Sequence, residues 1–192
     1  MPCLSEANQR ALLDLARKAI REAVRHHKLP DAIPSEGVFS ERRGVFVTIH
    51  VRGRLQGCIG VTEPNESLGE GVVRCAVSAA LEDPRFAPMK EPQLEEMSIE
   101  ISLLSPLEPI LLEAIEIGRH GLLVVNHTQR GLLLPKVATE HGLTREQFLE
   151  ETCHKAGLPR GAWKDAGTRL FGFTCEVFSD DPAWGTYHAM HR

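Results

Sequence analysis

The amino-acid sequence predicts an α+β fold in which packed helices cover a mainly antiparallel sheet. The first observation is a mixture of two apolar periodicities, with three- and four-residue steps in some segments and strict alternation in others. The second is that short links of hairpin length outnumber helical crossovers, which favours antiparallel pairing. The third is the length of 192 residues, which is typical of a single domain.

The composition excludes several classes of protein. Hydrophobic residues make up 42% of the chain and charged residues 25%, as in ordinary globular domains. The net charge of −4 disfavours nucleic acid as the main partner, because duplex-binding modules carry a basic face. No apolar run approaches a membrane span, and the segment Met1–Glu6 lacks the basic start and apolar core of a signal peptide. We therefore expect a cytoplasmic protein that binds neither nucleic acid nor membrane.

The cysteine pattern argues against disulfides and structural metal. The number of cysteines is odd, and no two have C-x-x-C spacing. They are Cys3, Cys58, Cys75, Cys153 and Cys175. His188 and His191 are three residues apart but lie in the expected C-terminal tail, and there is no glycine-rich phosphate loop. We expect reduced thiols, no metal and no tightly held cofactor of the protein's own.

The N-terminal segment predicts an amphipathic helix from about Glu6 to His27. Its apolar residues form one stripe, which we expect to pack on the sheet. The stripe consists of Leu12, Leu15, Ala16, Ala19, Ile20, Ala23 and Val24. Ser5 is a plausible N-cap, because its hydroxyl can accept a hydrogen bond from a free amide of the first turn.

Two strands and a helix follow. Val45–Val51 alternates cleanly, and the glycine-containing link Arg52–Arg54 then predicts a hairpin with a strand over Leu55–Val61. A second helix is expected from Pro64 and Asn65, with Asn65 as its cap, to about Leu81.

The second half repeats these patterns. Met97–Leu103 predicts a strand, and the runs Leu122–Val125 and Leu132–Leu134 predict a second hairpin. A capping box starts the expected helix Thr144–Ala156, and Gly157 supplies a left-handed C-terminal residue. Alternation over Phe171–Val177 predicts a last strand.

Six segments taken together resemble the AMMECR domain family, since their order and spacing are specific although each is short. They are Leu55–Gly60, Asp83–Phe86, Ile99–Pro106, Ile117–Leu122, Gly131–Ala138 and Cys153–Leu158. The resemblance implies an AMMECR-type domain over residues 7–178, with a larger and a smaller lobe, and leaves residues 179–192 as a C-terminal tail without clear periodicity.

The resemblance also implies partners, and this chain departs from the family pattern at two positions. It implies a genomic association in microbes with a Memo-like protein and a radical S-adenosylmethionine protein, and it supplies no established reaction. The signature hexapeptide of the family has arginine where this chain has Gln56, and the family usually has glutamine at the position of Lys136. Gln56 therefore removes a fixed cation beside the signature thiol.

Cys58 is the candidate nucleophile. It lies between Gly57 and Gly60, and glycines this close allow another backbone or a ligand to approach. The thiol would be activated by a cation or by the positive end of the helix expected to begin near Asn65. The alternative interpretation is a small buried cysteine in a strand, with the glycines serving a bulge.

Three further residues are candidates for roles around Cys58. His120 lies in a glycine-flanked turn and could act as the base, or could simply bond a carbonyl group of its turn. Glu100 could orient a histidine or bind a substrate amine, or could lie on the solvated face of its strand. Arg85 could clamp a carboxylate or phosphate, or could form a structural bridge to Asp83 or to helix carbonyls.

Two functional hypotheses follow. In the first, the protein is an enzyme or enzyme subunit in which the Cys58 thiol attacks a small molecule or peptide group, His120 or Glu100 assists, and Arg85, Gly57 and Gly60 bind the substrate. In the second, it is a non-catalytic module that docks a partner protein through the segment 57–60. The first hypothesis predicts that Cys58 is the most reactive thiol, with Cys75, Cys153 and Cys175 buried.

Overall fold

A computed structural model describes residues 4–63 and 65–181. The chain forms two compact units. Residues up to Leu103 and from Glu176 onwards form the first and larger unit, and Leu104–Cys175 form the second. Helices and antiparallel sheets occur in both, so the predicted α+β class is confirmed.

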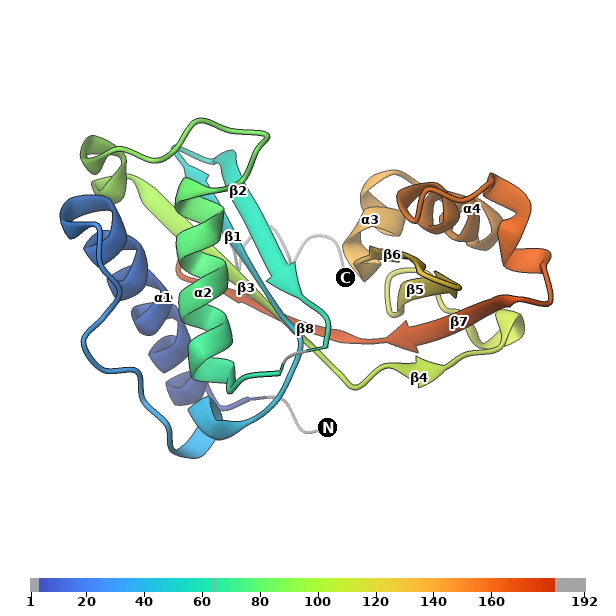
Figure 1. Ribbon diagram of the computed structural model, residues 1–192, viewed down its shortest axis with the longest axis horizontal. Coiled ribbons are helices and arrows are strands. Elements are labelled where there is room, and N and C mark those ends of the chain that lie inside the picture. Colours follow the sequence, from blue (N-terminus) through green and yellow to red (C-terminus); the bar gives the residue numbers. More distant parts are fainter. Residues whose placement is uncertain (1–3, 64, 182–192) are drawn as a thin grey trace. The chain divides into compact units, whose positions relative to one another are not determined.

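The first unit is a sheet covered on one face by two helices. The strand order is β2-β1-β3-β8, and β1 runs antiparallel to both β2 and β3. Figure 1 shows the helices α1 and α2 side by side over this sheet. The bounds are α1 Glu6–His26, β1 Val45–Val51, β2 Arg54–Val61, α2 Leu68–Leu81, β3 Met97–Leu104 and β8 Cys175–Ser179, with 3-10 turns at Gly37–Ser40 and Glu91–Glu95.

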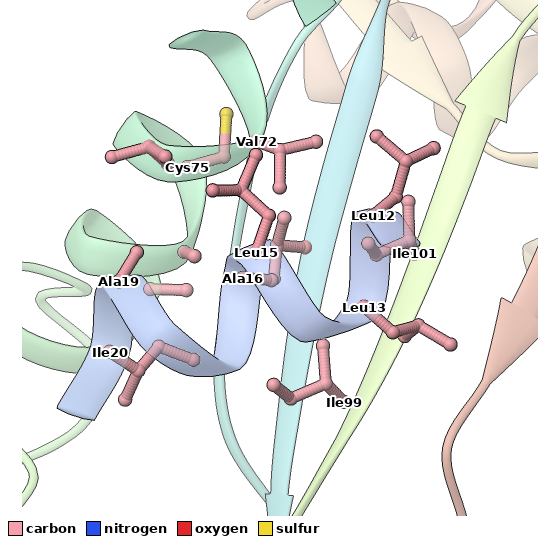
Figure 2. Close-up of a cluster of buried hydrophobic side chains, with 14 of the residues drawn as sticks. Leu12, Leu13, Leu15, Ala16, Ala19, Ile20, Val72, Cys75, Ile99 and Ile101 are labelled. Carbon is pink, nitrogen blue, oxygen red and sulfur yellow. The ribbon is translucent and has the colours of Figure 1, made fainter. Parts of the chain in front are cut away.

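Helix α1 packs its apolar stripe into the core of the first unit, as predicted. The hydroxyl of Ser5 accepts from the amide of Asn8 at 3.3 Å, and His27 ends the helix with a left-handed φ of 54°. Leu12 and Ile20 are fully buried and lie with Val72 of α2 and the inward side chains of β3 in one cluster (Figure 2). The burial of this stripe stabilises the helix far more than its intrinsic propensity does.

The hairpin of β1 and β2 is tighter than the sequence predicted. The link consists of Arg52 and Gly53, whose φ values of 52° and 72° are those of a type I′ turn. Strand β2 therefore begins at Arg54 instead of Leu55. The register shifts beside His50, because Ile49 pairs with Gly57 while His50 pairs with Leu55. Gln56 is thus the extra residue of a β-bulge and takes no position in the ladder.

Helix α2 begins later than predicted. Ser67 and not Asn65 is the N-cap, because the side chains of Ser67 and Glu70 form a reciprocal capping box. Both residues are good caps by type, so the choice depends on the acidic residue three positions further along.

The second unit has its own antiparallel sheet with two helices. Its strand order is β4-β7-β5-β6. The bounds are β4 Glu108–Pro109, β5 Gly121–Asn126, β6 Gln129–Leu133, α3 Pro135–Glu140, α4 Arg145–Lys155 and β7 Thr168–Phe173, with 3-10 turns at Leu112–Ala114 and Arg160–Lys164. The predicted hairpin, the capping box of Thr144 and the left-handed Gly157 at φ 74° are confirmed.

The prediction of one last strand was wrong, and α3 was not predicted. Phe173 of β7 pairs with Gly121 in the second unit, whereas β8 beyond Thr174 joins β3 in the first unit. Alternation continues through both strands because each has one covered face, so the pattern does not reveal the change of partner. Helix α3 has six residues, too few for a helical periodicity.

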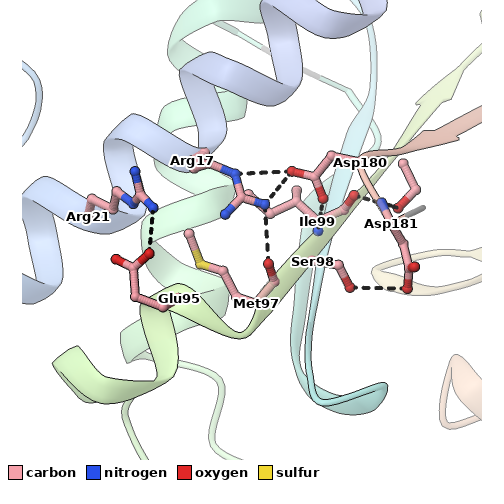
Figure 3. A network of polar contacts seen from close by, with 9 residues as sticks. Arg17, Arg21, Glu95, Met97, Ser98, Ile99, Asp180 and Asp181 are labelled. Carbon is pink, nitrogen blue, oxygen red and sulfur yellow. Dashed lines mark hydrogen bonds and ion pairs between the residues drawn. The ribbon is translucent and has the colours of Figure 1, made fainter. Parts of the chain in front are cut away.

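The end of β8 is fixed to α1 and β3 by a polar network (Figure 3). The guanidinium of Arg17 donates to Asp180 through Nε and Nη2 and also to the carbonyl oxygen of Met97, and Asp180 accepts from the amide of Ile99. The first residues of the expected tail, 179–181, therefore belong to the first unit. Residues 182–192, with His188 and His191, lie outside the described part of the chain, as does Cys3.

Candidate functional site

Cys58 belongs to a row of side chains that crosses three strands. Cys58 of β2 lies opposite Thr48 of β1, which in turn lies opposite Glu100 of β3. The neighbouring residues Val47 and Ile49 point into the helix-covered core, so this row lies on the other face of the sheet. Thr48 is only 5% exposed and Glu100 only 8%. Glu100 is therefore buried, and the alternative of a solvated strand face was wrong.

The thiol of Cys58 is half-buried and has a hydroxyl partner. The Oγ1 of Thr48 donates a hydrogen bond to Sγ at 3.2 Å. This contact is short because Cys58 and Thr48 form a non-hydrogen-bonded pair, in which opposite side chains come closest. A hydroxyl that donates to sulfur stabilises the thiolate, which is the nucleophilic form of cysteine.

Asp83 and Arg85 cap the main chain of Cys58 at the free edge of β2. The Oδ2 of Asp83 accepts from the amide of Cys58 at 2.9 Å, and Nη2 of Arg85 donates to the carbonyl oxygen of Cys58 at 3.2 Å. These two side chains take the place of a neighbouring strand, which satisfies the backbone groups that an edge strand would leave unpaired. Cys58 is therefore held by fixed bonds on both sides.

The carboxylate of Asp83 and the guanidinium of Arg85 form a two-point pair. Arg85 donates through Nε to Oδ1 at 2.9 Å and through Nη2 to Oδ2 at 2.7 Å, and its own amide also bonds Oδ1. These bonds, above all that of the Arg85 side chain, hold the pKa of Asp83 well below its usual range, although burial acts in the opposite direction. Asp83 is thus ionised at neutral pH.

Replacement of Asp83 by asparagine should destabilise the protein in a pH-dependent way. Because the pKa of Asp83 is lower in the folded than in the unfolded chain, its contribution is fully present above about pH 5 and is lost as the pH falls further. We expect Asp83→Asn to lower the free energy of unfolding at pH 7 by about 1.5–3 kcal/mol, since it breaks bonds between charged groups. Urea unfolding at pH 7 and pH 3 measures this.

The difference between wild type and Asp83→Asn should narrow at pH 3. Asp31→Asn is the matched control, because the Asp31 side chain is 91% exposed and its replacement should change little at either pH. A difference between wild type and Asp83→Asn that is equal at the two pH values would contradict the role assigned to the Asp83 charge.

The two glycines beside Cys58 serve packing within the first unit. A Cβ atom at Gly57 would lie 1.9 Å from the carbonyl oxygen of Ala79 in α2, and one at Gly60 would lie 2.2 Å from the ring of Phe46. Gly57 therefore allows the backbone of α2 to approach β2 closely. The sequence analysis had considered the approach of either another backbone or a ligand at these glycines. Substrate binding by Gly57 and Gly60 stays a prediction.

The prediction that the positive end of α2 activates the Cys58 thiol was wrong. Ala79 lies against Gly57, and it is in the last turn of a helix that begins at Leu68. At 1.5 Å per residue the N-terminus of α2 lies about 16 Å from Ala79 along the helix axis. The local positive charge beside Cys58 comes instead from the guanidinium of Arg85.

Gln56 forms a neutral tether at the position where the resemblance implied an arginine. Its Nε2 donates to the carbonyl oxygen of Ala87 at 2.8 Å, and its Oε1 accepts from Nε2 of Gln93 at 3.2 Å. The bulge frees Gln56 from the ladder, so its side chain can join β2 to the segment that follows Arg85.

His120 lies in the second unit and bonds within its own turn. Its Nδ1 accepts from the amide of Glu116 at 3.0 Å, and its amide donates to the carbonyl oxygen of Glu116. In this arrangement the lone pair of Nδ1 is already used as a hydrogen-bond acceptor. The pairing of His120 with Cys58 as base and nucleophile stays a prediction.

The other cysteines differ in exposure. Cys75 is fully buried, and burial raises the pKa of its thiol to about 11. Cys153 is also fully buried, and burial raises the pKa of its thiol. Their predicted burial is confirmed. Cys175 is half-buried like Cys58, so the prediction that it is buried was wrong. It lies where the chain passes from one unit to the other.

Thr48 and Asp83 are the site residues that the sequence analysis missed as such. Thr48 could have been found from the hairpin register, but the bulge at Gln56 shifts that register by one residue. Asp83 was considered only as a partner of Arg85, and its bond to the amide of Cys58 joins residues 25 positions apart.

The described residues contain neither a metal-binding cluster nor a membrane-spanning helix. Within residues 4–63 and 65–181, no three side chains of histidine, cysteine, aspartate or glutamate gather in a way that could hold a metal ion. None of the helices in these ranges has the length and apolar character needed to cross a membrane.

These features define an α+β protein of two compact units with a cysteine held at a sheet edge by an aspartate–arginine pair. The family model AMMECR1 matches residues 13–178 of the sequence. The chain therefore belongs to the AMMECR1 family, and the resemblance inferred from its six segments is confirmed.

Relatives and a solved structure agree with this assignment. A protein of Methanothermobacter thermautotrophicus is 44% identical over 188 residues, covering 93% of this chain and 97% of its own. A protein of Thermoplasma acidophilum, Ta0236, is 43% identical and covers 88% of this chain and 85% of its own. The crystal structure of the uncharacterised protein PH0010 from Pyrococcus horikoshii matches with a TM-score of 0.85 and 36% identity, covering 93% of this chain and 94% of that one.

Proposed function

We propose that this AMMECR1-family protein is an enzyme or enzyme subunit in which Cys58 is a thiol nucleophile toward a small molecule or a peptide group. The observation that carries the proposal is the hydrogen bond from the Thr48 hydroxyl to the sulfur of a half-buried cysteine. The rigid main chain of Cys58 supports it, because nucleophiles are most effective when the residue that bears them is fixed.

The proposed step is addition of the Cys58 thiolate to an electrophilic carbon. A sulfur–carbon bond forms, and the electron pair displaced from that carbon goes to a leaving group or to an oxygen. The thiol proton passes to a base before or during attack, and Glu100, in the same row beyond Thr48, is the candidate. Water or a second substrate would later cleave the sulfur–carbon bond and restore the thiol.

The family supplies the candidate setting for this activity. We place the protein in the cytoplasm, with a Memo-like or radical S-adenosylmethionine protein as a partner. Docking through the segment 57–60 is the competing function, but Gly57 and Gly60 pack against the protein's own Ala79 and Phe46. No specific contact of the described residues favours docking over chemistry.

Alkylation of the folded protein tests the nucleophile. With limiting iodoacetamide at pH 6.5 and peptide mapping by mass spectrometry, we expect Cys58 to be modified before Cys175, the other half-buried thiol of the described residues. Thr48→Val keeps the side-chain volume but removes the donor, and it should slow modification of Cys58 about tenfold. Thr48→Ser should retain the wild-type rate.

The same readout then identifies a substrate. Wild-type protein incubated with a metabolite extract should carry a mass adduct on the peptide that contains Cys58, and the Cys58→Ser variant should not. Modification of Cys175 ahead of Cys58, or modification of Cys58 only after denaturation, would show that Cys58 is structural and that the proposed function is wrong.

A further inference from the structure

We propose that the free edge of the Arg85 guanidinium binds the anionic group of the substrate, so that the electrophile attacked by Cys58 carries a carboxylate or phosphate. This inference rests on the proposed function and adds the chemical class of its substrate. It depends on which donors near Cys58 are already used and which are free.

The guanidinium of Arg85 is fixed in place by its other bonds. Nε and Nη2 are occupied by Asp83, whose carboxylate side chain is only 2% exposed, and Nη2 also bonds the carbonyl oxygen of Cys58. The stack of Arg85 on Phe86, with 5.3 Å from Cζ to the ring centroid, orients the same plane further. A fixed guanidinium loses little side-chain entropy when it binds an anion.

One nitrogen of this guanidinium is free. Nη1 of Arg85 makes no hydrogen bond to any residue within 4–63 and 65–181, and the side chain is 56% exposed. A guanidinium has five N–H donors, and each of the two on Nη1 can donate to an oxygen of an anion. These two N–H groups belong to the same guanidinium that bonds the carbonyl oxygen of Cys58.

The backbone amide of Cys58 cannot bind the anionic group of the substrate. In many cysteine hydrolases the amide of the nucleophile stabilises the oxygen that becomes negative, but here this N–H is bonded to the buried Asp83 at 2.9 Å. Negative charge on the substrate or in the transition state therefore has Arg85 as its nearest cationic donor among the contacts of Cys58.

The neutral net charge of the Asp83–Arg85 pair limits its attraction for anions to short range. Asp83 is ionised, so the Asp83–Arg85 pair is neutral as a whole and attracts distant anions weakly. Recognition must come from directed hydrogen bonds at Nη1 and not from the general field of the protein, whose net charge is −4. The anion must consequently lie against Nη1 of Arg85, whose Nη2 bonds the carbonyl oxygen of Cys58.

Two alkylating reagents that differ in charge provide the test. Iodoacetate carries a carboxylate, and iodoacetamide is its neutral analogue. In both reactions the thiolate displaces iodide from the same kind of carbon. We expect the ratio of the iodoacetate rate to the iodoacetamide rate to be about fivefold higher at Cys58 than at Cys175 in the same sample. Acetate or inorganic phosphate at constant ionic strength should slow iodoacetate at Cys58 and leave its reaction with Cys175 unchanged.

Variants assign the effect to Arg85. Arg85→Gln should bring the ratio at Cys58 down to that of Cys175, whereas Arg160→Gln should not, although Arg160 is an equally exposed arginine paired with Glu151. Arg85→Gln leaves Asp83 without its cation, so a thermal melt must show that the variant protein is folded. The competition by acetate is measured on the wild-type protein and does not depend on this variant.

The outcomes separate the two proposals. If neither reagent modifies Cys58 in the folded protein, the thiol function itself is wrong. If both modify Cys58 with the same rate ratio as Cys175, and neither acetate nor phosphate competes, the thiol function stands and the anion site at Arg85 does not exist.

Discussion

Replacement of Leu15 by aspartate is expected to leave the protein largely unfolded at room temperature. Leu15 is 6% exposed and lies in the core between α1 and α2 (Figure 2). The change removes buried apolar surface, which alone costs about 2–5 kcal/mol, and it forces an unpaired carboxylate into the core or the helix out of it. A domain with about 5–15 kcal/mol of stability does not tolerate this loss.

Circular dichroism and urea unfolding of Leu15→Asp measure this effect. Lys18→Asp is the control on the same helix, because Lys18 is exposed and the substitution introduces the same residue with its lower helix propensity. The control should change the free energy of unfolding by less than about 1 kcal/mol. A Leu15→Asp variant that melts like wild type would show that this stripe of α1 is not part of the core.

The elements that the sequence predicted well are those determined by local chemistry. Helix α1 combines an apolar stripe with a serine cap, and α4 combines a capping box with a left-handed glycine, so each start and stop is present within a few residues. The start of α2 was misplaced because Asn65 and Ser67 are both good caps. The continuous alternation of residues 171–177 conceals a change of sheet, which only tertiary structure decides.

The candidate site shows the same division. Cys58 and Arg85 could be selected because each lies in a short motif with an identifiable chemistry. The contacts of Cys58 with Thr48 and Asp83 depend on a strand register altered by the bulge and on a turn 25 residues away. The burial of Glu100 likewise depends on what the fold places around it, and the alternation of its strand does not reveal this.

Replacement of Gly57 by alanine should both destabilise the first unit and disturb the site. The added Cβ would lie 1.9 Å from the carbonyl oxygen of Ala79 and 2.8 Å from its carbonyl carbon. Because the obstructing atoms belong to the backbone of α2, no side-chain rotation relieves the clash, and the helix must move away from β2. We expect a loss of about 3 kcal/mol or more and a fall in Tm of roughly 6–12 °C.

Gly71→Ala is the matched control, in the helix α2 that Gly57 approaches. A Cβ atom there would make ordinary contacts, 3.4 Å from Cγ1 of Val45 and 3.7 Å from Oε1 of Glu66. Alanine inside a helix is favoured over glycine, so this variant should be equal to wild type or more stable by up to about 1 kcal/mol. The two substitutions add the same methyl group to one helix–sheet contact, and the structure predicts opposite signs for them.

Gly57→Ala should also slow alkylation of Cys58, because Asp83 directly follows α2 and moves with the end of that helix. When α2 is displaced, the bond from the amide of Cys58 to Asp83 lengthens and Arg85 loses its position on the carbonyl oxygen of Cys58. The rate at Cys175 should stay the same. A Gly57→Ala protein with wild-type Tm and wild-type rate at Cys58 would show that α2 does not approach β2 as closely as the structure places it.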